Sequence, residues 1–423
     1  MPKVVLAYSG GLDTSVCIPW LKEKKGVDVV AFSANVGQGE DLAPIEGKAK
    51  KSGAVAVYIE DLREKFVTDY VWPSLRAGAF YGDGYLLATA LSRPLITEAL
   101  VRIAEREGAD FIAHGCTGKG NDQVRFEASA VALCPRLRVI APVREWDMKT
   151  RDEEIDYAAK RGIPVPVTKK SPYSYDKNLW GISIECGVLE DPMAAPPEDA
   201  YVLTKSPAKA PDSPAEVTVG FRAGLPVSLD GKETRGLELI EKLNALGAEH
   251  GVGRLDVIED RLVGIKSREV YEAPAGTILH AAHRAVESMC LPKDVLEMQR
   301  VLSLRYGQLV YNGLWFGLLR ESLDEFFKRT QAEVEGSARV RLYKGQAVVT
   351  GRETARGLYD KSLSTYDTGD TFDRTASEGF VKLWSLPLRV EGARKRKAAS
   401  AGAARASGPT KGEKTEKPAA KKA

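Results

Sequence analysis

The sequence predicts an α/β protein that begins with a doubly wound parallel sheet and continues with a second α+β domain and a C-terminal arm. Three observations carry this prediction. Short apolar runs alternate with helical periodicity over about the first 165 residues, which is typical of βαβ units. A loop with two glycines joins the first apolar run to the first helical segment. Beyond residue 200, paired strand signals are mixed with long amphipathic helices.

Each element of the first part follows from its own pattern. Apolar runs predict strands at residues 4–7, 29–34, 55–59, 111–114 and 139–141. Helical periodicity predicts helices at residues 63–71, 93–106, 122–133 and 151–161. A further helix is predicted at residues 16–25, directly after the first strand and its loop. Pro19 lies inside it and cannot donate to the carbonyl of Ser15, so we expect a kink or an irregular first turn there. Ligands of such sheets bind beyond the carboxyl ends of the strands.

The second part mixes hairpins with helices. Residues 166–200 are rich in Pro, Ser and Gly but keep aromatic side chains, so we expect an ordered crossover. Strand signals fall at residues 216–221, 226–229, 255–259, 262–265, 338–343 and 346–351. Helical signals fall at residues 238–250, 277–289, 293–300 and 306–330. The expected domains are 1–168, 169–360, an oligomerisation arm at 361–392 and a tail at 393–423.

Composition excludes several classes of protein. The 423 residues include 43% hydrophobic and 28% charged side chains, as in globular proteins with two or three domains. No apolar run approaches the roughly 18 residues that a membrane span needs, and the N-terminus has no signal-peptide pattern. The five cysteines have no C-x-x-C spacing and the four histidines no metalloprotease pattern. We therefore expect a cytoplasmic protein with no metal site built from its own side chains.

The charge is unevenly distributed along the chain. Residues 393–423 contain ten Lys or Arg and two Glu, which gives this tail a net charge of +8. Because the whole chain has a net charge of +3, the other residues carry a net charge of −5. The tail has no large apolar side chain, so it cannot bury enough surface to offset its ordering entropy, and we expect it to be disordered. It could serve as a solubilising extension or as a weak tether to nucleic acid or another polyanion.

The loop after the first strand has the composition of a phosphate-binding loop. It reads Ala7, Tyr8, Ser9, Gly10, Gly11, Leu12, Asp13, Thr14, Ser15. Its glycines allow close backbone approach to an anion, and its hydroxyls and the helix N-terminus add donors. The alternative is a glycine-rich turn capped by Asp13. The loop lacks the Walker A and Gly-x-Gly-x-x-Gly patterns but resembles the PP-loop of the ATP pyrophosphatase superfamily, which implies an adenine nucleotide alpha hydrolase-like fold.

A second polar run follows the fourth strand. Residues 114–127 read His-Gly-Cys-Thr-Gly-Lys-Gly-Asn-Asp-Gln-Val-Arg-Phe-Glu. Asp122 could bind the ammonium of an amino acid, while Thr117 and Asn121 could bind its carboxylate. Arg125 shares a helix face with Asn121. The alternative is a polar turn with a helix cap. Cys116 is either a small spacer or a reactive thiol.

Taken together, the motifs resemble those of the argininosuccinate synthases along nearly all of residues 3–390. The matching segments are 7–15, 37–40, 85–89, 93–96, 114–127, 172–174, 178–181, 187–192 and 264–279. The resemblance implies a C–N ligase that condenses citrulline with aspartate at the expense of ATP, releasing AMP and pyrophosphate through a citrullyl-AMP intermediate. It also implies Mg²⁺ on the ATP phosphates and a homotetramer.

The resemblance also assigns roles to individual residues. It places ATP on residues Ala7 to Ser15, Ala34 and Gly115. It places aspartate on Thr117, Asn121 and Asp122. It places citrulline on Tyr85, Thr89, Ala90, Asn121, Arg125, Ser174, Ser183, Glu259 and Tyr271, and gives catalytic roles to Asp122 and Arg125. Ala90 stands where the family usually has Ser, so one hydroxyl contact is missing, and Thr89 could compensate for it.

Two other functions remain open from the residues. One is a different PP-loop enzyme, such as a tRNA-modifying sulfur or lysine ligase that holds RNA with its basic tail. The other is a nucleotide-binding sensor without turnover, for which the loss of a hydroxyl at Ala90 would be an early sign. The residues leave two candidates for the general base that deprotonates the aspartate amine, which are an ATP phosphate and Asp122. The number of subunits does not follow from the residues.

Overall fold

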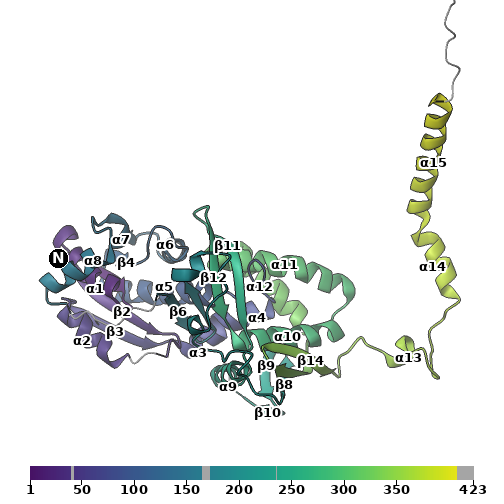
Figure 1. Ribbon diagram of the computed structural model, residues 1–423, viewed down its shortest axis with the longest axis horizontal. Helices are drawn as coiled ribbons and strands as arrows, with labels where there is room; N and C mark the ends of the chain where they lie inside the picture. Colours follow the sequence, from purple (N-terminus) through teal and green to yellow (C-terminus); the bar gives the residue numbers. More distant parts are fainter. Residues whose placement is uncertain (40–41, 164–171, 235, 407–423) are drawn as a thin grey trace, which may run out of the picture. The chain divides into compact units, whose positions relative to one another are not determined.

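The computed structural model describes residues 1–39, 42–163, 172–234 and 236–406, with side chains described to residue 403. Two compact units divide the chain, Met1–Leu358 and Tyr359–Ala423. In the first unit, the N-terminal sheet is fully parallel with strand order β3-β2-β1-β4-β5 (Figure 1). Its strands are β1 Lys3–Ala7, β2 Asp28–Asn35, β3 Ala56–Asp61, β4 Phe111–Ala113 and β5 Arg138–Ile140. All five match the predicted strands, and the order reverses between β1 and β4.

Helices connect these strands. They are α1 Leu12–Lys25, α2 Ala43–Lys51, α3 Arg63–Lys65, the π-helix η1 Phe66–Val71, α4 Trp72–Arg76, α5 Ala88–Glu107, α6 Asp122–Leu133, α7 Pro142–Glu145 and α8 Arg151–Lys160. The predicted helices at 16–25, 63–71, 93–106, 122–133 and 151–161 are among them, whereas α2, α4 and α7 were not predicted. The expected irregular first turn of α1 is wrong, because the helix is continuous from Leu12 through Pro19 to Lys25; the alternative, a kink at Pro19, stays a prediction. The buried side chains around Pro19, including Ile18 and Leu21, hold the helix despite one missing hydrogen bond.

The crossover segment contains a hairpin that the sequence pattern did not reveal. Its strands, β6 Ser174–Asn178 and β7 Gly181–Glu185, join β11 Arg254–Asp260 and β12 Lys266–Glu272 in a sheet of order β11-β12-β7-β6. The strand expected at residues 262–265 is wrong. These residues form the turn, in which Arg261 N donates to Ile265 O at 2.8 Å, and the strand starts at Lys266. Short 3-10 turns follow at η2 Gly187–Glu190 and η3 Glu198–Ala200.

A third sheet, antiparallel and of order β10-β9-β8-β13-β14, completes the second part. Its strands are β8 Ala215–Arg222, β9 Leu225–Leu229, β10 Lys232–Glu233, β13 Gly336–Tyr343 and β14 Gln346–Glu353. The hairpins predicted from the strand signals at 216–221 with 226–229 and at 338–343 with 346–351 are confirmed. The helices are α9 Gly236–Glu249, α10 Pro274–Cys290, α11 Lys293–Tyr311 and α12 Leu318–Gln331. Helix α10 packs on α9 and on strands β13 and β14.

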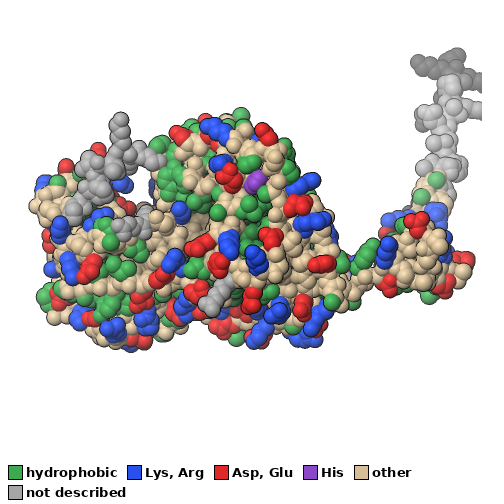
Figure 2. Space-filling model, turned by 90° about the horizontal axis from the view of Figure 1, so that it is seen from below, with side chains coloured by type: hydrophobic (Ala, Val, Ile, Leu, Met, Phe, Trp, Pro, Cys, Tyr) green, Lys and Arg blue, Asp and Glu red, His purple; other side chains and the backbone are tan. Residues whose placement is uncertain are grey.

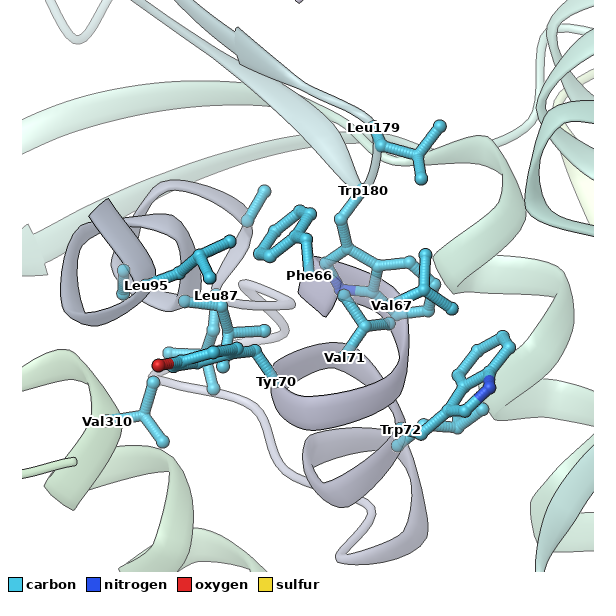
Figure 3. Close-up of a cluster of buried hydrophobic side chains, with 14 of the residues drawn as sticks. Phe66, Val67, Tyr70, Val71, Trp72, Leu87, Leu95, Leu179, Trp180 and Val310 are labelled. Atoms are coloured by element: carbon cyan, nitrogen blue, oxygen red, sulfur yellow. The ribbon is translucent and has the colours of Figure 1, made fainter. Parts of the chain in front are cut away.

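One hydrophobic core spans the join between the N-terminal sheet and the second part. Phe66 and Tyr70 from η1 pack with Trp180 from the β6–β7 turn and with Val310 from α11 (Figure 3). Trp180 is 1% exposed and Phe66 is fully buried. Because this core is shared, it fixes α11 and the β6–β7 hairpin against the parallel sheet, which sets the geometry of the site.

The second unit is helical, with α13 Lys361–Ser364, α14 Ala376–Trp384 and α15 Leu386–Ala406. The disorder expected from residue 393 is therefore wrong as far as Ala406, since Ala, Lys and Arg are strong helix formers. Residues 407–423 lie outside the described part. Pro387 occupies the first turn of α15, where proline is tolerated. Apolar side chains of α14, including Phe380 and Trp384, are exposed.

Charged side chains of both signs are interspersed over the face of the molecule seen in Figure 2. In the part of the chain that the structure describes, none of the helices combines the length and the apolar character needed to cross a bilayer.

Candidate active site

The loop between β1 and α1 is built as a compact cradle of hydroxyls and backbone amides. Gly10 has φ +77°, a left-handed conformation that favours glycine. The hydroxyls of Ser9 and Thr14 are hydrogen bonded at 3.0 Å, as are those of Tyr8 and Ser15. These hydroxyls therefore gather at the N-terminus of α1, and such a combination of hydroxyls and a helix N-terminus suits phosphate binding.

The loop after β4 closes against this cradle. A Cβ on Gly115 would lie 2.9 Å from Thr14 Cγ2, so only glycine allows this approach. Together the two loops line a cavity of about 450 Å³. The predicted nucleotide residues in its wall are Ala7, Tyr8, Ser9, Thr14, Ala34 and Gly115. Cys116 also lines it, and burial raises the pKa of its thiol, which favours the spacer interpretation.

At the start of α6, Asp122 is held by two guanidinium groups. Arg93 donates from Nε and Nη2 to Asp122 Oδ2 at 2.9 and 2.8 Å, and Arg125 Nη1 donates to Oδ1 at 2.8 Å. Burial opposes ionisation, but the two arginines outweigh it and lower the pKa of Asp122 to about 2. Arg93 also pairs with Asp176 on β6. Asp122 is therefore a fixed anion at the cavity wall.

The predicted citrulline residues gather on one face of the β11-β12-β7-β6 sheet. Tyr271 pairs with Ser183 in register, and Ser183 pairs with Asp176. Side chains directly opposite in neighbouring strands share a face, as do alternate residues of one strand, so Ser174 and Glu259 lie on this face too. It is the face that carries Asp176 and hence meets Arg93.

Tyr85 and Thr89 approach this face from the start of α5. The Tyr85 ring stacks on Tyr271 with centroids 4.1 Å apart, and its hydroxyl is hydrogen bonded to Thr89 Oγ1 at 2.7 Å. Ala90 is fully buried beside them. Tyr271 donates to Glu259 Oε1 at 2.6 Å. Burial raises the pKa of Glu259, against the opposing effect of its hydroxyl donors.

Some predicted residues stand apart from the cavity. Thr117 and Ser174 are exposed. The cavity lining includes Ala7, Tyr8, Ser9 and Thr14 of the loop but not Gly10, Gly11, Leu12, Asp13 or Ser15.

Sequence reasoning missed three residues that the structure brings into the site: Arg93, Asp176 and Tyr311. Arg93 belongs to the motif segment 93–96, and a cation next to the apolar residues of that segment was a usable signal. Asp176 lies in the hairpin that had no strand signal. Tyr311 ends a helix 190 residues after Asn121 and had no signal in the sequence, although its hydroxyl accepts from Asn121 Nδ2 at 2.8 Å.

A parallel sheet with a glycine-rich, hydroxyl-bearing loop at its switch point, and a second sheet with a polar face beside it, are the features of a PP-loop nucleotide-dependent ligase. Two family models match: the arginosuccinate synthase N-terminal HUP domain over residues 3–164 and the arginosuccinate synthase C-terminal domain over residues 173–391. The chain belongs to the argininosuccinate synthase family.

Full-length relatives agree. An argininosuccinate synthase of Chlorobium phaeobacteroides strain BS1 is 55% identical over 92% of this chain and 96% of its own length. That of Chlorobium chlorochromatii is 54% identical over 92% and 97%. That of Desulforamulus reducens is 54% identical over 94% and 99%. The resemblance drawn from the motifs is therefore confirmed, and so is the HUP-type α/β fold.

Proposed function

We propose that this chain condenses citrulline with aspartate at the expense of ATP, giving argininosuccinate, AMP and pyrophosphate through citrullyl-AMP. One observation carries the proposal. Ion pairs connect the wall of the nucleotide cavity to the sheet face that carries the predicted citrulline residues, because Arg93 contacts both Asp122 and Asp176. A nucleotide in the cavity and an amino acid on the sheet face would therefore be neighbours.

In this reaction the ureido oxygen of citrulline attacks the α-phosphorus of ATP, and the aspartate amine then displaces AMP. Neither step needs a covalent bond to the protein, so positioning and charge stabilisation supply the catalysis. The amides and hydroxyls of residues 9–15 would hold the phosphates. Glu259, Tyr271 and the hydroxyls nearby would hold the charged and polar groups of citrulline.

Arg125 and Asp122 would act at the boundary between the two substrates. Arg125 is 4% exposed and donates to Asp122 at the cavity wall, and in this proposal it would stabilise negative charge on the transferred group. Asp122, with its pKa of about 2, is a poor proton acceptor at neutral pH. Of the two bases left open by the sequence, a phosphate of the nucleotide is thus the better candidate.

Mg²⁺ belongs to the same proposal. This ion is bound mostly through phosphate oxygens and water in nucleotide sites, and it would offset the charge of the leaving pyrophosphate. The carboxylate of Asp13, in the first turn of α1, and the hydroxyls of Ser9 and Thr14 are the oxygen ligands that the loop could add. Thr117 and Asn121 would hold aspartate, as the family motif implies.

We further propose a cytoplasmic homotetramer assembled through the arm. The support is α14, on which Phe380 and Trp384 stack at 5.6 Å while both stay more than half exposed. Such an apolar helix face requires a partner in a stable protein. A second copy of the chain would provide it. Sedimentation of the purified protein tests this, since a monomer at micromolar concentration would contradict the proposal.

Pyrophosphate release tests the reaction itself. Purified protein, ATP and Mg²⁺ are combined with citrulline alone, aspartate alone and both together, and argininosuccinate is measured in parallel. We expect argininosuccinate only with both amino acids. Release that depends on tRNA would instead favour a tRNA-modifying enzyme, and ATP binding without any release would favour a sensor.

A further inference from the structure

We infer that Tyr311, the last residue of α11, is a positioning residue that holds Asn121 and Glu259 in their substrate-binding geometry. The inference rests on the proposed function, because it takes these two residues as substrate contacts. It adds to the same site a residue that lies 190 positions after Asn121 in the chain.

The hydroxyl of Tyr311 joins the two residues in a fixed direction. An amide nitrogen can only donate, so Asn121 Nδ2 donates to the Tyr311 oxygen at 2.8 Å. The Tyr311 proton is then available for Glu259 Oε2, which lies at 2.8 Å. Glu259 accepts from Tyr271 through its other oxygen. Both carboxylate oxygens are therefore oriented by tyrosine hydroxyls.

The same contact fixes which way the Asn121 amide faces. Leu262 N donates to Asn121 Oδ1 at 2.9 Å, so the oxygen end is held from the turn between β11 and β12 and the nitrogen end from α11. Each end still has one free hydrogen-bonding position. Asn121 can thus offer one donor and one acceptor to its substrates in defined directions without searching between amide orientations.

The rest of Tyr311 is itself held in place. Its ring stacks on Tyr81 with centroids 3.5 Å apart and an interplanar angle of 5°. Its carbonyl accepts from Arg125 Nε at 3.0 Å, and the guanidinium carbon lies 5.0 Å from its ring centroid. The carbonyl and ring contacts do not depend on the hydroxyl, so a phenylalanine at this position would remove the two hydroxyl contacts alone.

Helix α11 also supplies a matched control. Tyr306 is buried one and a half turns earlier, and its hydroxyl donates to Asp324 at 2.7 Å. It packs on Trp315 and Phe327, and among the described residues its hydrogen-bond and ring partners include none of the proposed substrate residues. Tyr306→Phe therefore makes the same chemical change in the same helix, with a carboxylate partner, but outside the site.

The experiment compares the full-length protein with its Tyr311→Phe and Tyr306→Phe variants, with kinetic constants for each substrate and thermal unfolding measured in parallel. For Tyr311→Phe we expect kcat/KM for citrulline to fall about tenfold to hundredfold, as for loss of a hydrogen bond to a charged group. We expect KM for ATP to change less than about twofold, because the nucleotide cavity keeps its contacts. Tyr306→Phe should lower the unfolding temperature and leave all constants close to those of the wild type.

A pH profile separates positioning from a general effect on the fold. Hydrogen bonds to a carboxylate favour its ionised form, so losing one should move the acidic limb of kcat/KM for citrulline to higher pH in Tyr311→Phe only. Equal kinetic constants in the two variants, or equal losses for all three substrates, would overturn the inference while leaving the reaction intact. A wild type that forms no argininosuccinate would instead remove the proposed function and the inference with it.

Discussion

Glu269 gives the protein a stability that should depend on pH in the neutral range. It lies on β12, on the same face as Tyr271, and is 6% exposed. Arg261 Nη2 lies 2.6 Å from its Oε1, and Ser267 donates to it at 2.6 Å. Burial raises the pKa of Glu269 to about 7, with a further contribution from Glu185, against the opposing effects of Arg261 and Ser267.

The sign and size follow from linkage. A carboxyl group whose pKa is about 7 in the folded state and 4.5 in the unfolded state is held protonated by folding. Its contribution is full below pH 4.5 and is lost as the pH rises through about 7. Between pH 5 and pH 8 the wild type should lose about 2.5 kcal/mol of its free energy of unfolding through this group.

The test substitutes glutamine, which cannot ionise. Urea unfolding of the wild type and Glu269→Gln is followed by circular dichroism at pH 5 and pH 8, at one protein concentration. The wild type should lose about 2.5 kcal/mol relative to the variant between the two pH values. Glu238→Gln, on the exposed surface of α9 beside Lys242, serves as control and should show no such difference. A difference in free energy of unfolding between the wild type and Glu269→Gln that is the same at pH 5 and pH 8 would refute the reasoning.

Three further changes test the site and the arm. Gly115→Ala would place its Cβ 2.9 Å from Thr14 Cγ2 and should raise KM for ATP about tenfold or more, measured by initial rates; an unchanged KM would count against the nucleotide cavity. Asp122→Asn removes the charge shared with Arg93 and should lower kcat/KM for aspartate about hundredfold; an effect confined to ATP would contradict its role. Truncation after Glu391, where the family model ends, should keep activity and subunit count by rate assay and sedimentation; dissociation would show that the extension of α15 takes part in assembly.

The sequence predicted the parallel sheet well because buried strands and amphipathic helices leave strong local patterns. It failed for the β6–β7 hairpin, since Ser174–Asn178 is polar and gains its strand form only by pairing with Gly181–Glu185. It also failed for the arm beyond residue 393, where composition indicated disorder but helix propensity was high. The misplaced strand at residues 262–265 shows how apolar turn residues can imitate a strand.

The candidate site shows the same division. Motif residues such as Gly115 and Asp122 were found because their chemistry is visible in the sequence. The contacts that orient these residues were not predicted, because Arg93, Asp176 and Tyr311 come from separate segments of the chain. Only the register of the second sheet and the end of α11 bring them together.

The distance along the chain between partners in the site has a consequence for synthesis. All strands of the N-terminal parallel sheet lie within residues 3–140, so this sheet can form early during synthesis on the ribosome. The contact between Asn121 and Tyr311 spans 190 residues and cannot close until much later, because pairing of such distant segments is slow and must follow their synthesis. The parallel sheet that carries the β1–α1 loop can therefore form well before Tyr311 is available to orient Asn121.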